Sequence, residues 1–157
     1  MTGELRQTSF AEVKERRGTD QSSLTAFGGG SNETFIAVVQ APNDTGIDEL
    51  CDEWMQELGM PRFLLEQFWS KRSAYRSNPS ISNAHNAAFD EVELHDKYVS
   101  YLYNDDDAQD AIDEIIERLT SDENITLVCF EGDGKKCHRH ILMDMIEREM
   151  PRFELEV

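Results

Sequence analysis

Two compact apolar runs stand out along the chain. TFIAVVQA (34–41) is apolar and β-branched and ends before Pro42, and ITLVCF falls within residues 124–130. Short apolar runs bounded by polar residues are typical of buried strands. ELRQTS (4–9) predicts a further short strand, and the alternation in RFELEV at the end of the printed sequence predicts an edge strand.

Helical spacing fills the segments between these runs. An apolar stripe at i, i+3 and i+4 predicts a helix over 47–58 that Gly59 ends, and the stripe consists of Ile47, Leu50, Cys51, Trp54, Met55 and Leu58. The stretch Thr45–Asp48 resembles a capping box at its start. Further helices are predicted in FAEVKERR, after Pro61, from about residue 87 to 103, after the acidic triplet 105–107, and from about 137 to 149.

Helices that alternate with apolar strands predict the fold class. We expect a three-layer α/β sandwich with a mostly parallel, Rossmann-like sheet flanked by helices. The 157 residues suit a single domain over 1–157. Residues 18–32 (GTDQSSLTAFGGGSN) predict a flexible Gly/Ser-rich loop. A phosphate-binding loop is the alternative, but the stretch lacks the lysine and the strand-loop-helix context of that motif.

The charge is strongly acidic and is spread over the predicted helices. Asp and Glu number 32 against 15 Lys and Arg, which gives a net charge of −17. Salt screens such repulsion, so the composition favours a halophilic origin. The alternative is a mesophilic protein that binds a basic partner. Acidity usually argues against nucleic-acid binding, but a salt-adapted proteome is acidic throughout, so nucleic-acid binding stays open.

Cysteine content and hydropathy bear on the compartment. Three cysteines cannot all pair, which favours a reducing environment. No apolar stretch has the length of a membrane span, and no basic region followed by an apolar one opens the chain. We therefore expect a cytoplasmic protein with no membrane partner. No cofactor is predicted, and the oligomeric state stays open.

CFEGDGKKCHRH (129–140) concentrates the candidate chemistry. If 124–130 is a central strand, Cys129 lies near its carboxyl end, and Cys137-His138-Arg139 lie at the amino end of the next helix. Ligands bind in this crevice of open α/β sheets. Unpaired N–H groups, Arg139 and His138 favour an anion there, and Lys135 and Lys136 add positive charge. The stretch predicts a pocket for a small anionic ligand.

The same surroundings make the cysteines candidate nucleophiles. A thiol at a helix amino end beside basic groups is expected to have a lowered pKa, and Cys137 meets that description, with Cys129 expected to face it across the loop. Zinc binding by Cys129, Cys137, His138 and His140 is an alternative. The two histidines stand two positions apart on a helix, which hinders their convergence on one ion.

A purely structural interpretation stays open as well. In it Cys129 is a core residue, Cys137 is a small buried residue, and Arg139 pairs with Asp133 or Glu131. Cys51 belongs to the apolar stripe of its predicted helix, so we interpret it as core. His85 and Asn86, before a predicted helix, are weaker candidates for the pocket, and helix capping is the alternative for them.

The pattern Cys-x-Glu followed by Cys-His-Arg resembles the closing signature of the domain-of-unknown-function 488 family. Here it consists of Cys129, Glu131, Cys137, His138 and Arg139. The resemblance extends through WMQELGMPRFLLEQF and AHNAAFDEVELHDKY, covers roughly residues 35 to 147, and is strongest to the haloarchaeal members. The short acidic segment NDTGIDELCDE departs from the family pattern, and the GGGSN loop has no counterpart. The resemblance implies an α/β sandwich with Cys-His-Arg at the pocket, and it implies no reaction.

These observations leave three function classes. The first is an enzyme on a small anionic or nucleotide-like substrate, with Arg139 holding the anion, Glu131 and His138 as acid and base, and Cys137 or Cys129 as nucleophile. His85 and Asn86 would help bind the ligand. The second is a module that binds the same ligand without turnover. The third is an interaction protein whose acidic surface contacts a basic partner.

Overall fold

A four-stranded parallel sheet forms the base of the molecule in the computed structural model, which describes residues 3–9, 33–38, 51–130 and 134–155. Its order is β1 (Leu5–Ser9), β4 (Asn124–Cys129), β2 (Glu33–Ala37) and β3 (Glu53–Trp54). All three pairings are parallel, and β4 lies between β1 and β2. The end of β4 is therefore central in the sheet.

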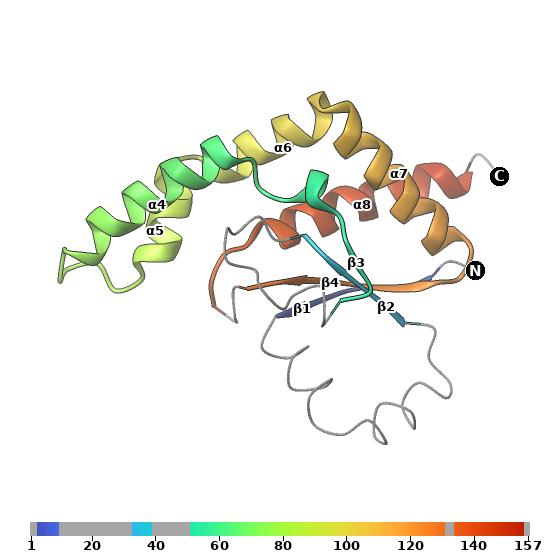
Figure 1. The fold of residues 1–157 in the computed structure, drawn as a ribbon, viewed down its shortest axis with the longest axis horizontal. Coiled ribbons are helices and arrows are strands. Elements are labelled where there is room, and N and C mark those ends of the chain that lie inside the picture. Colours follow the sequence, from blue (N-terminus) through green and yellow to red (C-terminus); the bar gives the residue numbers. More distant parts are fainter. Residues whose placement is uncertain (1–2, 10–32, 39–50, 131–133, 156–157) are drawn as a thin grey trace, which may run out of the picture.

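Helices cover one side of this sheet (Figure 1). They are the 3-10 turn η1 (Gln56–Leu58) and the α-helices α4 (Arg62–Arg76), α5 (Ala84–Glu91), α6 (Leu94–Asn104), α7 (Asp106–Thr120) and α8 (His138–Leu155). α7 shows why the sequence forms them. The Asp105 side chain caps it by accepting from the Ala108 N–H at 2.9 Å, and its apolar stripe is buried throughout.

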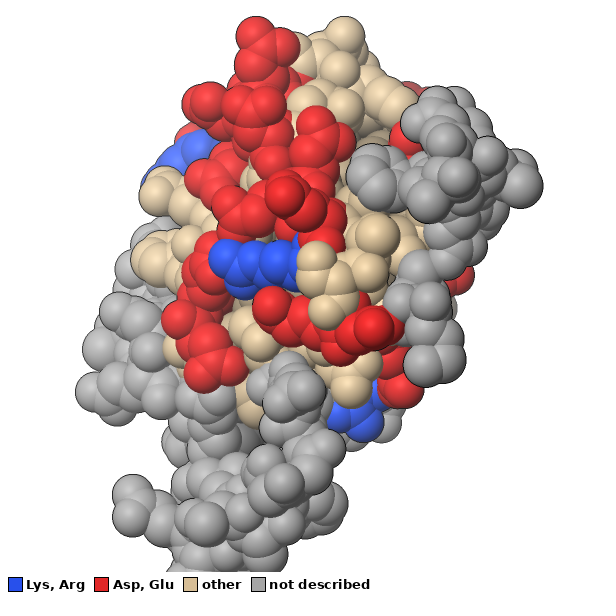
Figure 2. Space-filling view, turned by 90° about the vertical axis from the view of Figure 1, so that its right-hand side faces the viewer, with Lys and Arg blue, Asp and Glu red and all other residues tan. Residues whose placement is uncertain are grey.

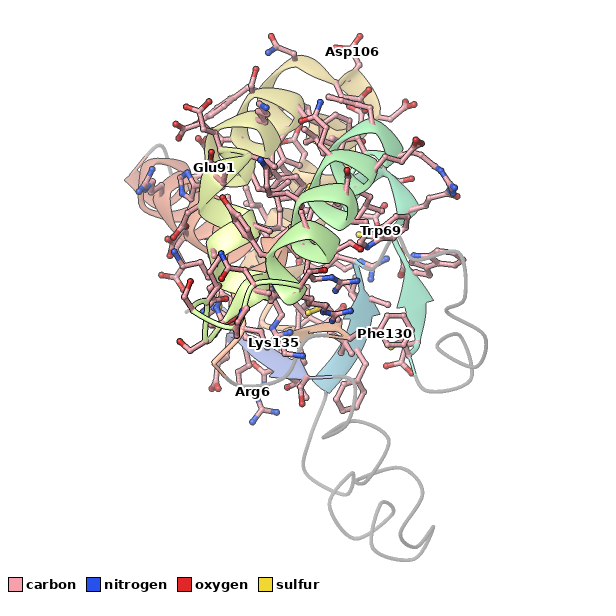
Figure 3. All side chains as sticks on the ribbon, turned by 90° about the vertical axis from the view of Figure 1, so that its left-hand side faces the viewer. Arg6, Trp69, Glu91, Asp106, Phe130 and Lys135 are labelled. Carbon is pink, nitrogen blue, oxygen red and sulfur yellow. The ribbon has the colours of Figure 1, made fainter. Side chains whose placement is uncertain are left out.

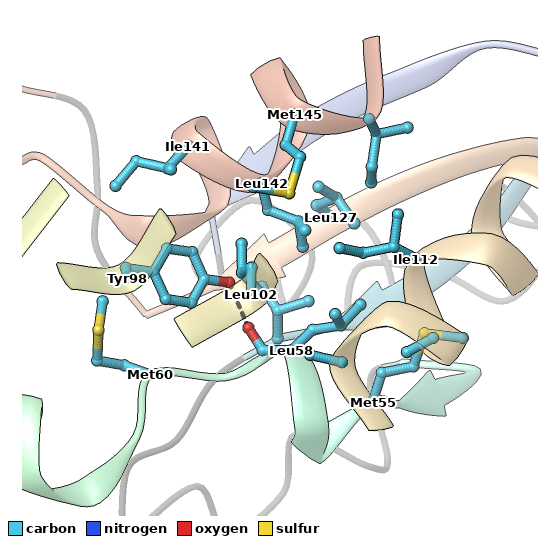
Figure 4. Packing of buried hydrophobic residues seen from close by; sticks show 14 of the residues in the cluster. Met55, Leu58, Met60, Tyr98, Leu102, Ile112, Leu127, Ile141, Leu142 and Met145 are labelled. Atoms are coloured by element: carbon cyan, nitrogen blue, oxygen red, sulfur yellow. Dashed lines mark hydrogen bonds between the residues drawn. The ribbon is translucent and has the colours of Figure 1, made fainter. Parts of the chain in front are cut away.

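The main core lies between the sheet and the helices (Figure 4). Leu127 of β4 and Leu142 of α8 are fully buried, and Ile112 of α7 is 2% exposed. Burying a side chain of this size contributes roughly 1.5–3 kcal/mol. Tyr98 is fully buried among them, and its hydroxyl donates to the Leu58 carbonyl. This bond joins α6 to η1 in the middle of the apolar core.

The fold class expected from the sequence is confirmed: helices pack on a parallel sheet in an α/β sandwich. The strands expected at 4–9, 34–41 and 124–130 correspond to β1, β2 and β4. No helix among the described residues is long and apolar enough to cross a membrane. FAEVKERR and the loop 18–32 lie outside the described residues.

The helix expected over 47–58 is wrong where the structure describes it, from residue 51 on. Glu53–Trp54 form β3 at the sheet edge, and only Gln56–Leu58 turn helically. The Asp52 N–H donates to Phe35 O at 2.9 Å, and the Met55 N–H donates to Ala37 O at 3.1 Å. Pairing with β2 therefore uses backbone N–H groups that a helix would bond internally. Met55 and Leu58 are buried as the stripe predicted, but Trp54 is 39% exposed.

Two further expectations need correction. The helix expected from 87 to 103 is two helices, because Glu93 between α5 and α6 takes a left-handed φ of 55° that an α-helix does not allow. The edge strand expected in RFELEV is wrong, since α8 continues to Leu155. Extending a formed helix adds backbone hydrogen bonds without a new nucleation cost, and six alternating residues do not overcome that advantage.

Acidic side chains dominate the face on the right of Figure 1, which Figure 2 shows directly. Arg118 of α7 lies among them and contacts Glu53 at 2.7 Å and Glu114 at 2.5 Å. Its Nη1 also lies 3.9 Å from Glu123. One arginine thus offsets part of the repulsion between three carboxylates on neighbouring elements.

Candidate functional site

The candidate site lies at the carboxyl edge of three neighbouring strands. Cys129 is the last residue of β4, and it pairs in register with Ser9, the last residue of β1. The Val38 N–H, just after β2, donates to Val128 O at 3.2 Å. The chain then returns to this edge, because α8 begins at His138. The structure thus confirms the strand end and the helix start that the sequence predicted for this stretch.

Four of the predicted site residues are buried here. Cys129 is 0% exposed, Cys137 2%, Arg139 3% and His138 6%. The two thiols pack in a small cluster with Cys51, Phe35 and Val128, separate from the main core. None of the three cysteines forms a disulfide. Cys51 is a core residue, as the sequence predicted, and it neighbours the site.

His138 is held in one orientation by contacts on two sides. Its Nε2 contacts the Val38 carbonyl oxygen. A carbonyl oxygen only accepts, so Nε2 carries the proton, and Nδ1 of the neutral ring is an acceptor. Nδ1 lies 3.7 Å from Cys137 Sγ. The Tyr98 ring packs edge-on against the imidazole, with the centroids 5.4 Å apart at 82°.

Arg139 places a positive charge beside the second thiol. Its Nη1 donates to Cys129 Sγ, and both groups are buried. Guanidinium stays charged in proteins, so this contact places a positive charge at the carboxyl end of β4. Burial raises the pKa of Tyr98 well above its ordinary value, and negative charge on Cys137, Tyr101 and Cys129 raises it further. Tyr98 therefore stays a neutral donor.

His85 and Asn86 lie in the first turn of α5, and they hold the loop that leads into Cys137. The His85 Nε2 donates to Lys136 O at 2.7 Å. The Asn86 Nδ2 donates to Gly134 O at 2.9 Å, and its Oδ1 accepts from the Lys136 N–H at 2.8 Å. Asn83 caps α5 instead, by accepting from the Asn86 N–H at 3.0 Å. The two residues contact the loop backbone, and neither is the helix cap.

The sequence of this chain matches a known family model. The DUF488-N3a family model, described as the active DUF488-N3 subclade, matches residues 31–150. The chain belongs to the DUF488 family. Searches of curated proteins and of solved structures returned no match. The matched range covers most of the chain, and it confirms the family that the sequence resembled.

Not every residue of the predicted site lies in this group. Glu131 and Asp133 lie outside the described residues. His140 is exposed, whereas the two thiols are buried. Desolvation lowers the pKa of its imidazole, and the charge of Arg139 lowers that pKa further. Within the described part of the chain, no three His, Cys, Asp or Glu side chains are placed to hold a metal ion.

Sequence reasoning missed three residues of the site. Val38 orients His138, Tyr98 packs on its ring, and Ser9 lies beside Cys129 and is 6% exposed. Val38 and Tyr98 lie far along the chain from residue 138, and apolar patterning marks both only as core. Ser9 carried the one usable signal, because a polar residue that ends a buried parallel strand faces the ligand edge.

Proposed function

We propose that this DUF488 chain is a thiol-dependent enzyme that acts on a small anionic or nucleotide-like substrate at the carboxyl edge of the sheet. The observation that carries the proposal is the contact of Cys137 Sγ with His138 Nδ1 at 3.7 Å, on a ring whose other nitrogen contacts Val38 O. A nucleophile beside a base that a third group orients is the usual arrangement of activated cysteines.

In this proposal Cys137 is the nucleophile and His138 the base. The thiol proton passes to Nδ1, and the resulting thiolate attacks the electrophilic atom of the substrate. The imidazolium keeps its Nε2 proton on Val38 O and then returns the Nδ1 proton to the leaving group. Glu131 is proposed as a second acid or base on the sequence argument, and its position lies outside the described residues.

Charge around the thiols supports the anionic substrate. Arg139 is a buried cation, and the amino end of α8 presents backbone N–H groups beside it. Cys129 is proposed to position this arginine through the Nη1–Sγ contact, and it is the second candidate nucleophile. Cysteines that form no disulfide suit a reducing compartment, so the proposal places the enzyme in the cytoplasm.

A binding module without turnover is the second candidate function. It is favoured by burial, since Cys129 and Cys137 are 0% and 2% exposed. A reactive thiol must be reached by its substrate, whereas a core cysteine needs no access. Both functions involve binding of the same anionic ligand, and they differ in whether Cys137 reacts with it.

Alkylation with a charged and a neutral reagent tests the proposal. Iodoacetate and iodoacetamide differ in charge and react by the same chemistry, and mass spectrometry resolves Cys51, Cys129 and Cys137. We expect a higher ratio of iodoacetate to iodoacetamide labelling at Cys137 than at Cys51, and protection of Cys137 by inorganic phosphate. Equal ratios at the two cysteines without protection would leave the binding module as the better account.

A further inference from the structure

A cavity of about 560 Å³ adjoins the loop before Cys137. It lies where α4 ends and α5 begins, and its lining includes Arg76, Ser82, Asn83, His85, Gly134 and Lys135. Figure 3 views the molecule from this side, with Lys135 labelled beneath α4 and α5. The volume falls within the range of roughly 300–1,000 Å³ that is usual for small-molecule sites.

The charge of this cavity is opposite to that of the protein. Arg76 and Lys135 are exposed and line it, and no Asp or Glu is among its lining residues within the described part of the chain. The neighbouring Lys136 differs, because its Nζ contacts Asp90 at 2.5 Å. In a chain of net charge −17, two cations around a cavity whose described lining includes no carboxylate favour an anion locally.

The amino end of α5 adds hydrogen-bond donors to the same wall. Ala84 is its first residue, His85 its second, and both line the cavity. The positive end of the helix dipole at an amino end favours phosphate, although the Asn86 N–H of α5 is already bonded to the Asn83 side chain. The Ser82 hydroxyl is a further donor in the lining. Cations, backbone donors and a hydroxyl together match the oxygens of a phosphate group.

The cavity is linked to the thiols through the loop. His85 lines the cavity, and its Nε2 donates to the carbonyl of Lys136, the residue before Cys137. Gly134 and Lys135 form part of the cavity wall and belong to the same loop. A ligand held at Arg76 would therefore contact the segment that positions the proposed nucleophile.

We propose that this cavity binds the phosphate group of a phosphomonoester, with Arg76, Lys135 and the amino end of α5 as its partners. The assignment of that phosphomonoester as the substrate rests on the proposed function. The binding itself depends only on the cavity. The site is separate from Arg139, which lies buried beside Cys129.

Calorimetric titration of the full chain at one ionic strength tests this site, with inorganic phosphate, AMP and adenosine as probes. We expect phosphate and AMP to bind and adenosine to bind at least tenfold more weakly, because charged hydrogen bonds carry the affinity. Arg76→Ala and Lys135→Ala should each weaken AMP about tenfold or more. Arg62→Ala is the matched control, since it removes an exposed arginine from the other end of α4.

The outcomes separate this site from the proposed function. The site is overturned if neither phosphate nor AMP binds, if adenosine equals AMP, or if Arg76→Ala behaves as Arg62→Ala does. Cys137→Ser should leave AMP binding unchanged. Binding that needs Arg76 in a protein whose Cys137 is inert supports the phosphate site and refutes the thiol enzyme. A reactive Cys137 that phosphate protects equally well in Arg76→Ala refutes the cavity site alone.

Discussion

Asn86 joins α5 to the loop before Cys137, and Asn86→Ala tests whether that link positions the site. The substitution removes the donor to Gly134 O at 2.9 Å and the acceptor of the Lys136 N–H at 2.8 Å. It leaves His85 and its bond to Lys136 O in place. The change is therefore confined to one side chain and two backbone groups of the loop.

The expected cost follows from these two bonds. Each contributes a net stabilisation of about 0.5–1.5 kcal/mol. Gly134 and Lys136 are exposed, so water can replace the lost partners, and values in the lower half of that range apply. Alanine also has a higher helix propensity than asparagine, by roughly 0.6 kcal/mol. The net loss of unfolding free energy is then about 1 kcal/mol, or a fall in Tm of roughly 2–4 °C.

Urea unfolding followed by circular dichroism measures this loss, and amide hydrogen exchange measures the loop itself. We expect the Lys136 amide to exchange about fivefold faster in Asn86→Ala, which corresponds to about 1 kcal/mol. Asn104→Ala is the matched control, because among the described residues the Asn104 side chain bonds within its own helix, to Ser100 O at 2.7 Å. Unchanged Lys136 exchange, or the same change in the control, would refute the reasoning.

The other predictions concern side chains around the site. Tyr98→Phe should lower the unfolding free energy by about 1–3 kcal/mol in urea unfolding, because the buried Leu58 carbonyl loses its donor, and an unchanged value would contradict that bond. Burial raises the pKa of Tyr101 to about 12, and the negative charge of Asp105 makes the next largest contribution. The folded state therefore favours the neutral phenol of Tyr101. The contribution of this phenol to the free energy of unfolding is complete below about pH 10 and is lost between about pH 10 and 12. Phenolate absorbance should show that Tyr98 and Tyr101 titrate at higher pH than the other tyrosines. A single transition common to all tyrosines would refute this prediction. Asp105→Ala removes the cap of α7 and should cost about 0.5–2 kcal/mol by the same unfolding assay, whereas a change within error would mean that the cap bond to Ala108 is weak in solution.

Patterning predicted the elements whose signal is local. β4 and α7 are present as expected, because a compact apolar run favours a buried strand and a single capped apolar stripe favours a helix. Residues 51–58 carry a helical stripe too, but the free edge of β2 pairs with Glu53 and Trp54. That pairing depends on the tertiary position of β2, which no local pattern encodes.

The place of the candidate site was predictable, and its contacts were not. A strand that ends at Cys129 and a helix that starts at His138 bring the signature to the carboxyl edge of any parallel sheet. The bond from His138 to Val38 O spans 100 positions of the chain, and the Tyr98 contact comes from a separate helix. Both follow from packing. The burial of the thiols follows from packing too, and whether a reagent or substrate reaches Cys137 separates the two candidate functions.

The measurement that tests the central claim most directly is the alkylation rate of each cysteine at neutral pH in high salt, resolved by mass spectrometry. It is made on the unmodified chain and on His138→Gln, with the urea unfolding free energy of both. If Cys137 and His138 form a reactive pair, Cys137 reacts about tenfold faster than Cys51 or more, and His138→Gln abolishes the difference. If all three cysteines react at one common rate equal to that of global unfolding, they are core residues and the thiol enzyme is refuted.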